Sequence, residues 1–346
     1  MTSCSRPHSG LVSRTLLASR FVALVAGLVI ATAAEAQVVV KLGTIAPEGS
    51  VWGDALQRVA RSWKEASGGK VELRIFAGGV LGGEDELVRK LQRRVIDAVT
   101  LSGSGLPTLE RSFNCLNMPL LFESSDELDY VRERVAPAIE KRLDAKGFAV
   151  LNWAIAGWVN IFSKEPIRLP ADLRRTRFWM SSGDPETEKI YKAFGVHVVP
   201  LPVTEMMTGL QTGLIDATAA PPLYALLDRT FQVAGHMLDI HWGALNAATI
   251  VRADAWARVP EELRPRLAEA ARREGVAMRD VGRKSGDDAV REMQKRGLVV
   301  TVPTAAERAK WREEAASTYP GLRGAYCPAE LYDDVMRFHA ESRRPR

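Results

Sequence analysis

Short apolar segments with strand character alternate along this chain with segments whose apolar residues recur at helical spacing. In the first third of the chain, strand patterns cover residues 38–43, 71–75 and 95–101, and helix patterns begin near Ser50 and at Glu84. This alternation is typical of an α/β domain with a largely parallel sheet. Ligands of such sheets bind beyond the carboxyl ends of the strands. We therefore predict an α/β fold whose ligand-facing residues directly follow its strands.

Hydroxyl-bearing residues follow two of these strand patterns. Thr44 comes after the first pattern, and Ser102 and Ser104 come after the third. Their position makes them candidates for contact with a ligand. The same residue types also form ordinary turns, so both interpretations stay open for each of the three.

The segment from Pro170 to Tyr224 repeats the alternation. It contains, in order, a strand, a helix, a second strand, a second helix and a third strand. Trp179 lies in the first of these strands, and both outer strands end at small, turn-forming residues, as expected for strands that face a ligand. This segment predicts one half of a solute-binding cleft, with Trp179 in it.

Two longer apolar segments, residues 147–163 and 236–251, read as strands that pass between two lobes. Two crossings between α/β lobes form a hinge, and closure of two lobes around a ligand is how periplasmic binding proteins work. A helix-rich segment, residues 261–296, is long enough to link the lobes. The glycines expected to kink this helix are Gly275, Gly282 and Gly286.

These features predict an α/β periplasmic binding protein of type II-like architecture, with a ligand cleft between two lobes and a long helix linking them. Lobe I is expected to comprise residues 37–156 and about 245–284. Lobe II is expected to comprise residues 157–244 and about 285–346.

Residues 1–36 have the pattern of a secretory signal peptide. Three arginines precede an apolar run at residues 21–31, and the small residues Ala34 and Ala36 then frame a cleavage site. The run is shorter than the roughly 20 residues that span a bilayer. We expect cleavage before Gln37 and a periplasmic location for the mature protein.

The charge balance argues against binding to nucleic acid. The chain carries 47 Lys and Arg against 42 Asp and Glu, for a net charge of +5. Removal of residues 1–36 takes away three Arg and one Glu, which lowers the net charge to +3. No basic stripe with interleaved aromatic residues is present, so we expect no nucleic-acid partner.

Two cysteines, Cys115 and Cys327, remain in the expected mature chain. In an oxidising compartment they could form one long-range disulfide. Their spacing does not show whether they are close in space, so the bonded and the free state are both open.

The sequence lacks the motifs of common catalytic and cofactor sites. It contains no His-Glu-x-x-His, no Cys-x-x-Cys and no Gly-x-Ser-x-Gly. The four histidines beyond residue 36 are scattered and have no cysteine or carboxylate at the spacing of metal ligands. We predict a protein that is not an enzyme and that needs no metal or other cofactor.

Six segments, whose order and spacing fit one known family, carry a resemblance: residues 42–52, 71–84, 119–122, 163–167, 170–173 and 205–216. Through them the chain from residue 37 onwards resembles the extracytoplasmic substrate-binding proteins of tripartite ATP-independent periplasmic (TRAP) transporters, the DctP family. The resemblance implies a two-lobe fold that closes on a ligand, and delivery of the solute to a small and a large integral-membrane permease subunit.

The chain departs from this family at three positions that bind the substrate. Typical members place an arginine in the strand after the Asp172-Leu173 segment, where it clamps a carboxylate bidentately; here that position is Trp179. A second arginine of some members corresponds to Trp158, and the usual asparagine to Ala220. Two indoles at a cleft favour an apolar, aromatic or flat ligand, or a cation held over an indole face.

Other residues near these positions are further candidates. Arg177 shares a strand face with Trp179 and would supply a charge from one side. Asp184 would meet a cationic group of the ligand or cap the following helix. Tyr224 and Trp242 are weaker candidates for the cleft. For Trp179 and Trp158 the alternative is packing in the core.

The leading hypothesis is thus a periplasmic protein that captures a small organic solute for a TRAP transporter. A binding module that presents its closed form to a signalling receptor is the second hypothesis. A periplasmic enzyme on a two-lobe scaffold is the third, and the absence of an acid–base pair in the sequence argues against it.

Overall fold

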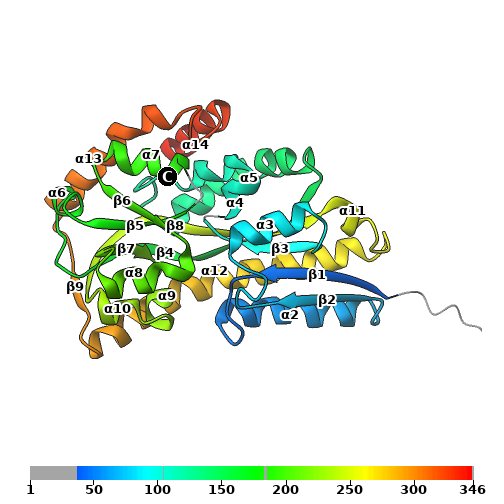
Figure 1. Ribbon diagram of the computed structural model, residues 1–346. Coiled ribbons are helices and arrows are strands. Elements are labelled where there is room, and N and C mark those ends of the chain that lie inside the picture. Colours follow the sequence, from blue (N-terminus) through cyan, green and yellow to red (C-terminus); the bar gives the residue numbers. More distant parts are fainter. Residues whose placement is uncertain (1–36, 104, 183–184, 345–346) are drawn as a thin grey trace, which may run out of the picture. The chain divides into compact units, whose positions relative to one another are not determined.

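One mixed β-sheet runs through the part of the chain that the computed structural model describes, residues 37–103, 105–182 and 185–344 (Figure 1). The predicted signal peptide, Ser104 and Asp184 lie outside these residues. The strand order is β2-β1-β3-β8-β4-β7-β5-β6, and β9 pairs with β8. The strands are β1 (Val38–Thr44), β2 (Val71–Phe76), β3 (Ala98–Leu101), β4 (Phe148–Ser163), β5 (Arg177–Ser181), β6 (His197–Leu201), β7 (Ala217–Ala220), β8 (His236–Arg252) and β9 (Val299–Thr301).

Helices connect the strands and cover the sheet. The longer ones are α2 (Val51–Ala66), α3 (Glu84–Gln92), α5 (Ser125–Asp144), α7 (Pro185–Ala193), α12 (Arg264–Lys295), α13 (Ala305–Leu322) and α14 (Ala329–Ser342). The shorter ones are α4 (Gly105–Leu109), η1 (Arg111–Leu116), α6 (Pro170–Leu173), η2 (Val203–Glu205), α8 (Met206–Thr212), α9 (Pro222–Leu227), α10 (Thr230–Val233) and α11 (Ala253–Trp256).

The sheet contains two parallel parts joined by two long antiparallel strands. β1 pairs in parallel with β2 and β3, and β5 pairs in parallel with β6 and β7. β4 and β8 pair with each other along most of their length, and they join the two parallel parts because β8 also pairs with β3 and β4 with β7. The predicted alternation of strands and helices and the two crossing strands are therefore present.

The pairing of β4 with β8 is interrupted near the middle of both strands. The register shifts between Ile155 and Trp158, where Gly157 has a φ of 125°. Such a backbone angle favours glycine because it has no Cβ. The predicted division between residues 156 and 157 falls at this interruption, which is where a hinge between two parallel parts of a sheet is expected.

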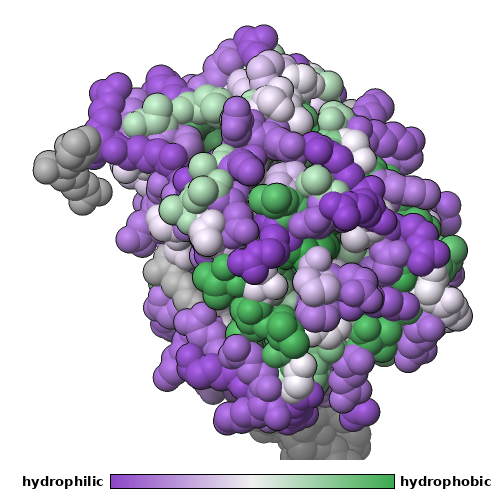
Figure 2. Space-filling model, turned by 90° about the vertical axis from the view of Figure 1, so that its left-hand side faces the viewer, coloured by the Kyte–Doolittle hydropathy of each residue, from purple (hydrophilic) through white to green (hydrophobic). Residues whose placement is uncertain are grey.

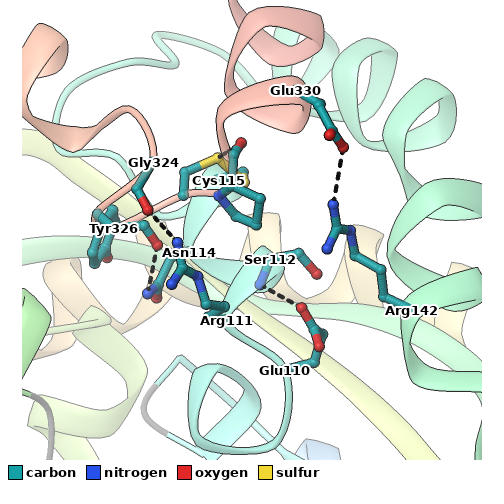
Figure 3. The surroundings of a disulfide bond; sticks show 11 residues. Glu110, Arg111, Ser112, Asn114, Cys115, Arg142, Gly324, Tyr326 and Glu330 are labelled. Carbon is teal, nitrogen blue, oxygen red and sulfur yellow. Dashed lines mark hydrogen bonds and ion pairs between the residues drawn. A yellow bond between two sulfur atoms is a disulfide. The ribbon is translucent and has the colours of Figure 1, made fainter. Parts of the chain in front are cut away.

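The C-terminal helix does not follow the predicted division of the chain. Residues from about 285 onwards were assigned to lobe II, but α14 packs on α5 and η1, which belong to the predicted lobe I. A disulfide between Cys115 in η1 and Cys327, just before α14, joins the same two regions (Figure 3). The other C-terminal elements agree with the predicted lobe II, since β9 pairs with the start of β8 and α13 packs on α6 and α7. We therefore keep the lobe division as a proposal, with α14 outside lobe II.

The long predicted helix is present as α12, which contacts β4, α2 and α9 (Figure 1). It is one uninterrupted helix of 32 residues, so its glycines do not break it. Two of them permit close contact with β4 instead. A Cβ on Gly275 would lie 2.5 Å from the carbonyl oxygen of Trp153, and one on Gly282 would lie 3.0 Å from that of Ile155.

This contact predicts opposite effects for two alanine substitutions in α12. Gly275→Ala is expected to lower the free energy of unfolding by about 1–3 kcal/mol, because its Cβ would collide with backbone. Gly286→Ala is the matched control, since its Cβ would meet nothing within 4 Å, and it is expected to stabilise by up to about 1 kcal/mol through helix propensity. Urea unfolding measures both. Equal effects would show that α12 does not depend on this contact.

Helix α2 begins shortly after β1, and a hydrogen bond at its N-terminus fixes where it starts. Ser50 is its N-cap, and the Ser50 Oγ accepts a hydrogen bond of 3.1 Å from the Gly53 amide. Further along, Trp63 is fully buried and donates from Nε1 to the carbonyl oxygen of Leu267 in α12 at 2.9 Å. This bond holds α2 against α12, so that both helices can wall one cavity.

The face of the molecule seen in Figure 2 is mostly hydrophilic, with hydrophobic side chains gathered near its middle. The exposed large hydrophobic residues around η2, α8, α9 and β9 are Val203, Leu214, Leu227, Val299 and Val302. Within the described ranges, no helix has the length and hydropathy needed to cross a bilayer.

Candidate solute-binding site

A cavity of about 60 Å³, here called the first cavity, lies where the ends of β1 and β3 meet α2, α12 and the middle of β4 and β8. Its walls are mainly apolar, with hydroxyl, amide and carboxylate groups between the apolar side chains. The lining residues are Thr44, Ile45, Ala46, Trp52, Ala55, Leu56, Val59, Glu84, Thr100, Leu101, Ser102, Asn152, Ala154, Ala156, Tyr224, Ala247, Thr249, Glu274, Gly275 and Met278.

A pair of stacked aromatic rings forms one wall of this cavity. Trp52 in α2 and Tyr224 in α9 have ring centroids 4.6 Å apart and planes inclined by 16°. Trp52 is 8% exposed, and its buried Nε1 has no hydrogen-bond partner among the described residues. Burial raises the pKa of Tyr224, and the Glu84 carboxylate raises it further. The tyrosine is therefore a neutral hydroxyl at physiological pH.

A buried carboxylate fixes the loop that follows β3. Glu84, the first residue of α3, is 5% exposed. Its Oε1 accepts from the backbone amide and the hydroxyl of Ser102, both at 2.7 Å, and its Oε2 accepts from the Gly105 amide at 2.7 Å. The position at a helix N-terminus also favours the negative charge. Glu84 thus holds Ser102 at the wall of the first cavity.

Three of the predicted residues line the first cavity: Thr44, Ser102 and Tyr224. The hydroxyl of Thr44 also accepts a hydrogen bond of 3.2 Å from the Ala46 amide, as a turn-forming residue does. The Ser102 hydroxyl instead donates to the carboxylate of Glu84 in α3, which is not the local bond of a turn-forming residue. Their contact with a solute stays a prediction.

Trp158 lies in a different place from these three residues. It lines a second cavity, of about 230 Å³, together with residues of β8, β9 and α12. Among the lining residues that the structure describes, Ala156 alone is common to both cavities. The predicted pairing of Trp158 with Trp179 in one cleft is therefore not what the structure has.

Trp179 lines neither cavity. Its half-buried side chain packs against a hydrophobic cluster that contains Phe162, Met206 and Leu210. Core packing, the alternative left open for Trp179, thus describes its surroundings. Its Nε1 is buried and has no hydrogen-bond partner within the described part of the chain.

Arg177 and Trp242 are placed away from both cavities as well. Arg177 begins β5, at the opposite end of the strand from the carboxyl edge, and its Nε donates to Asp216 Oδ2 at 2.9 Å. Trp242 is 5% exposed and donates from Nε1 to the Tyr191 hydroxyl at 3.0 Å. Neither side chain is therefore available to a solute in the first cavity.

Sequence reasoning missed Trp52 and Glu84. Trp52 lies on the apolar face of its helix, so its spacing indicated core packing. It also occupies the first turn of the helix that follows β1, and this closeness to a strand end is the signal that could have identified it. Glu84 had the same signal, because it follows the loop after β2.

Residues 42–322 match the family of bacterial extracellular solute-binding proteins, family 7, called DctP. The chain belongs to this family. Among its relatives, the 2,3-diketo-L-gulonate-binding periplasmic protein YiaO of Escherichia coli K12 is 23% identical over 239 residues, 68% of this chain and 73% of that protein.

Solved structures confirm the predicted fold class. The sugar acid binding protein DctPAm of Advenella mimigardefordensis has a TM-score of 0.82 at 20% identity, over 88% of this chain and 99% of its own. A TRAP periplasmic solute binding protein of Desulfovibrio salexigens has a TM-score of 0.82 at 21% identity, over 88% of this chain and 100% of its own. The DctP chain described here thus has the two-lobe α/β fold of these proteins.

Membership in the DctP family also shows which class of protein this is, a substrate-binding protein or an enzyme. The members of this family are extracytoplasmic substrate-binding proteins of TRAP transporters and not enzymes. The prediction of a TRAP solute-binding protein without catalytic activity is confirmed at this level.

Proposed function

We propose that this protein captures a small organic solute in the first cavity and delivers it to the small and large membrane subunits of a TRAP permease. Residues 1–36 would direct it to the periplasm as a cleaved signal peptide. The observation that carries the proposal is the stacked pair of Trp52 and Tyr224. These rings come from α2 and α9, on opposite sides of the predicted lobe division, and meet at a cavity behind the strand ends.

The polar groups of the cavity favour recognition by hydrogen bonds. The described lining contains no arginine or lysine, and its carboxylates belong to Glu84 and Glu274. Glu274 is paired with Arg58 at 2.8 Å. The unpartnered Nε1 of Trp52 supports a solute with a hydrogen-bond acceptor, because a buried donor without a partner costs free energy.

The expectation of an apolar or aromatic ligand has lost its basis. It rested on two tryptophans in one cleft, and neither Trp158 nor Trp179 lines the first cavity. The solved relatives are described with bound galactonate and orotic acid, which are acids. We propose a solute that offers acceptor oxygens to Trp52 and Thr44 and a hydrogen-bond donor to the Ser102 Oγ, whose own proton is donated to Glu84. The solute forms no bidentate pair with arginine.

The test begins with the solute itself. Protein purified gently from periplasm is examined by native mass spectrometry, and the solute that it carries is identified and titrated against the emptied protein by tryptophan fluorescence. Tyr224→Ala is expected to weaken binding at least about tenfold, or about 1.4 kcal/mol, because it removes one aromatic wall.

A matched aromatic substitution provides the control. Tyr130→Ala changes a residue of α5 that lines neither cavity, and it is expected to leave the affinity within about twofold. Unchanged affinity in Tyr224→Ala, with the fold intact by circular dichroism, would remove the first cavity from the proposal.

The proposed delivery to a permease has a separate test. Genes for one small and one large integral membrane protein are expected beside the gene for this chain. A neighbouring gene for a sensor kinase, without permease genes, would favour the signalling hypothesis instead.

A further inference from the structure

The second cavity has the features of a built binding site. Its volume of about 230 Å³ greatly exceeds the roughly 10–15 Å³ that one water molecule needs by the same measure. Its residues come from the middle of β4, the start of α9, β8, β9 and α12. They are Ala156, Gly157, Trp158, Asn160, Pro221, Pro222, Leu223, Met237, Asp239, His241, Gly282, Gly286, Asp287, Val290, Arg291 and Val300.

A buried amide in this cavity lacks a partner. Asn160 is 4% exposed, and its Oδ1 accepts no hydrogen bond from the described residues. An acceptor left unsatisfied in a buried place costs about 1–3 kcal/mol, so such groups usually have a partner. The amide lies on β4 among the lining residues, where a donor group of a bound molecule could supply that partner.

The side wall of the cavity is held in place before any ligand enters. The rings of Trp158 and His241 stack with centroids 4.5 Å apart and an interplanar angle of 10°. Trp158 Nε1 donates to the Ser125 hydroxyl at 3.2 Å, and His241 Nδ1 lies 3.4 Å from the Glu123 carbonyl oxygen. Hydrogen bonds on the outer side of both rings therefore fix the wall.

The ionisable side chains that the structure describes in the lining leave an excess of negative charge. Asp239 and Asp287 contribute carboxylates, and the nearest recorded cation to Asp239 is Arg308, at 3.9 Å. Arg291 also lines the cavity, but its guanidinium is engaged by Asp288. Burial lowers the pKa of His241 despite the nearby Asp239 and Asp287, so its ring is mostly neutral at pH 7 and does not offset the carboxylates.

We propose that the second cavity is a binding site, distinct from the solute site, for a small molecule that carries an ammonium group. Ammonium N–H groups donate to the Asn160 Oδ1 and to the carboxylates of Asp239 and Asp287. Charge-assisted hydrogen bonds of this kind are stronger than neutral ones. The volume lies below the range of about 300–1,000 Å³ that is usual for drug-sized ligands, so the bound molecule is small.

The experiment uses the mature protein and two probes of equal size, ethanolamine as its ammonium form at pH 7 and neutral ethylene glycol. The indole N–H signal of Trp158, assigned by its loss in Trp158→Phe, reports binding at the cavity wall in ¹H–¹⁵N correlation spectra. Ethanolamine is expected to shift this signal saturably and to bind at least about tenfold more tightly than ethylene glycol.

Two variants locate the contact. Asn160→Ala and Asp239→Asn are each expected to raise the Kd for ethanolamine at least about fivefold. Asp239 is partly exposed, so its variant is expected to fold even if Asn160→Ala does not. Asp334→Asn, on the exposed side of α14, is the charge-matched control and is expected to leave the Kd unchanged.

Three results would overturn the proposal. One is the absence of a saturable shift of the Trp158 signal, and another is equal binding of the two probes. The third is an unchanged Kd in both variants. Titration of the first-cavity solute against the same variants is independent of these results, so that the solute site and the ammonium site can fail separately.

Discussion

Replacement of Cys115 and Cys327 with alanine is expected to lower the free energy of unfolding by about 2–5 kcal/mol. The two residues are separated by 212 positions, so the crosslink closes a long loop in the unfolded chain. Both side chains are fully buried in the folded protein. The bond joins η1 to the loop before α14 (Figure 3). Urea unfolding under oxidising conditions measures the difference between the variant and the natural protein.

Hydrogen bonds around the disulfide are expected to keep the local structure in place when the disulfide is removed. Asn114 Nδ2 donates to the Tyr326 carbonyl oxygen at 3.2 Å, and Arg111 donates to that of Gly324. These bonds hold the same loop, so the variant is expected to keep its fold and to lose stability mainly through a freer unfolded state. The dependence of unfolding on urea should then become steeper, because the unfolded chain exposes more surface.

The matched control is the natural protein unfolded in the presence of a thiol reductant. Its unfolded chain also lacks the crosslink, so its urea midpoint is expected to coincide with that of the double variant. If the double variant unfolded at the same urea concentration as the natural protein under oxidising conditions, the disulfide would contribute nothing to stability.

Glu84→Ala is expected to lower the free energy of unfolding by at least about 2 kcal/mol. The carboxylate accepts three hydrogen bonds of 2.7 Å. Its removal takes away the acceptor to which the backbone amides of Ser102 and Gly105 donate. Hydrogen bonds to charged groups contribute about 1.5–3 kcal/mol each, although neighbouring bonds are not additive. Solute affinity is expected to fall as well, because Ser102 loses its anchor at the first cavity.

Two further variants separate the role of the buried acceptor from that of charge. Glu84→Gln keeps one acceptor oxygen and is expected to lose less stability than the alanine variant. Glu86→Ala removes an exposed carboxylate of the same helix, paired with Arg89 and Lys90, and is expected to change stability much less than Glu84→Ala does. Equal losses in Glu84→Ala and Glu86→Ala would contradict the role assigned to the buried bonds.

Much of the fold follows from local patterns. The strand predicted at residues 38–43 is β1, the segment at 236–251 is β8, and the long helix at 261–296 is α12. Each is long or strongly periodic, so its type depends on its own residues. The sequence did not predict the close contact of Gly275 and Gly282 with β4, because that contact depends on the distance between two elements and not on helix propensity.

The site was predicted less well than the fold. Thr44, Ser102 and Tyr224 line the first cavity, and the sequence singled them out because they follow strands or a strand-ending Pro-Pro pair. Trp158 lines the second cavity and not the first. The register of β4 against β8 shifts between Ile155 and Trp158, and a change of one residue in register moves a side chain to another face. Gly157 inside the strand is a local sign of an irregularity, but it does not determine the register on either side of it.

The sequence by itself determined the α/β class, the two crossing strands, the linking helix and membership in a family of solute-binding proteins. These depend on hydrophobic periodicity and on motifs that lie within single segments. Only the tertiary structure decided that Cys115 meets Cys327, that Trp52 stacks on Tyr224, and that Asn160 lacks a partner. The first two join segments far apart in the chain. All three depend on contacts between distant segments, namely the packing of α14 on η1, of α12 on α2 and α9, and of β4 on its neighbouring strands.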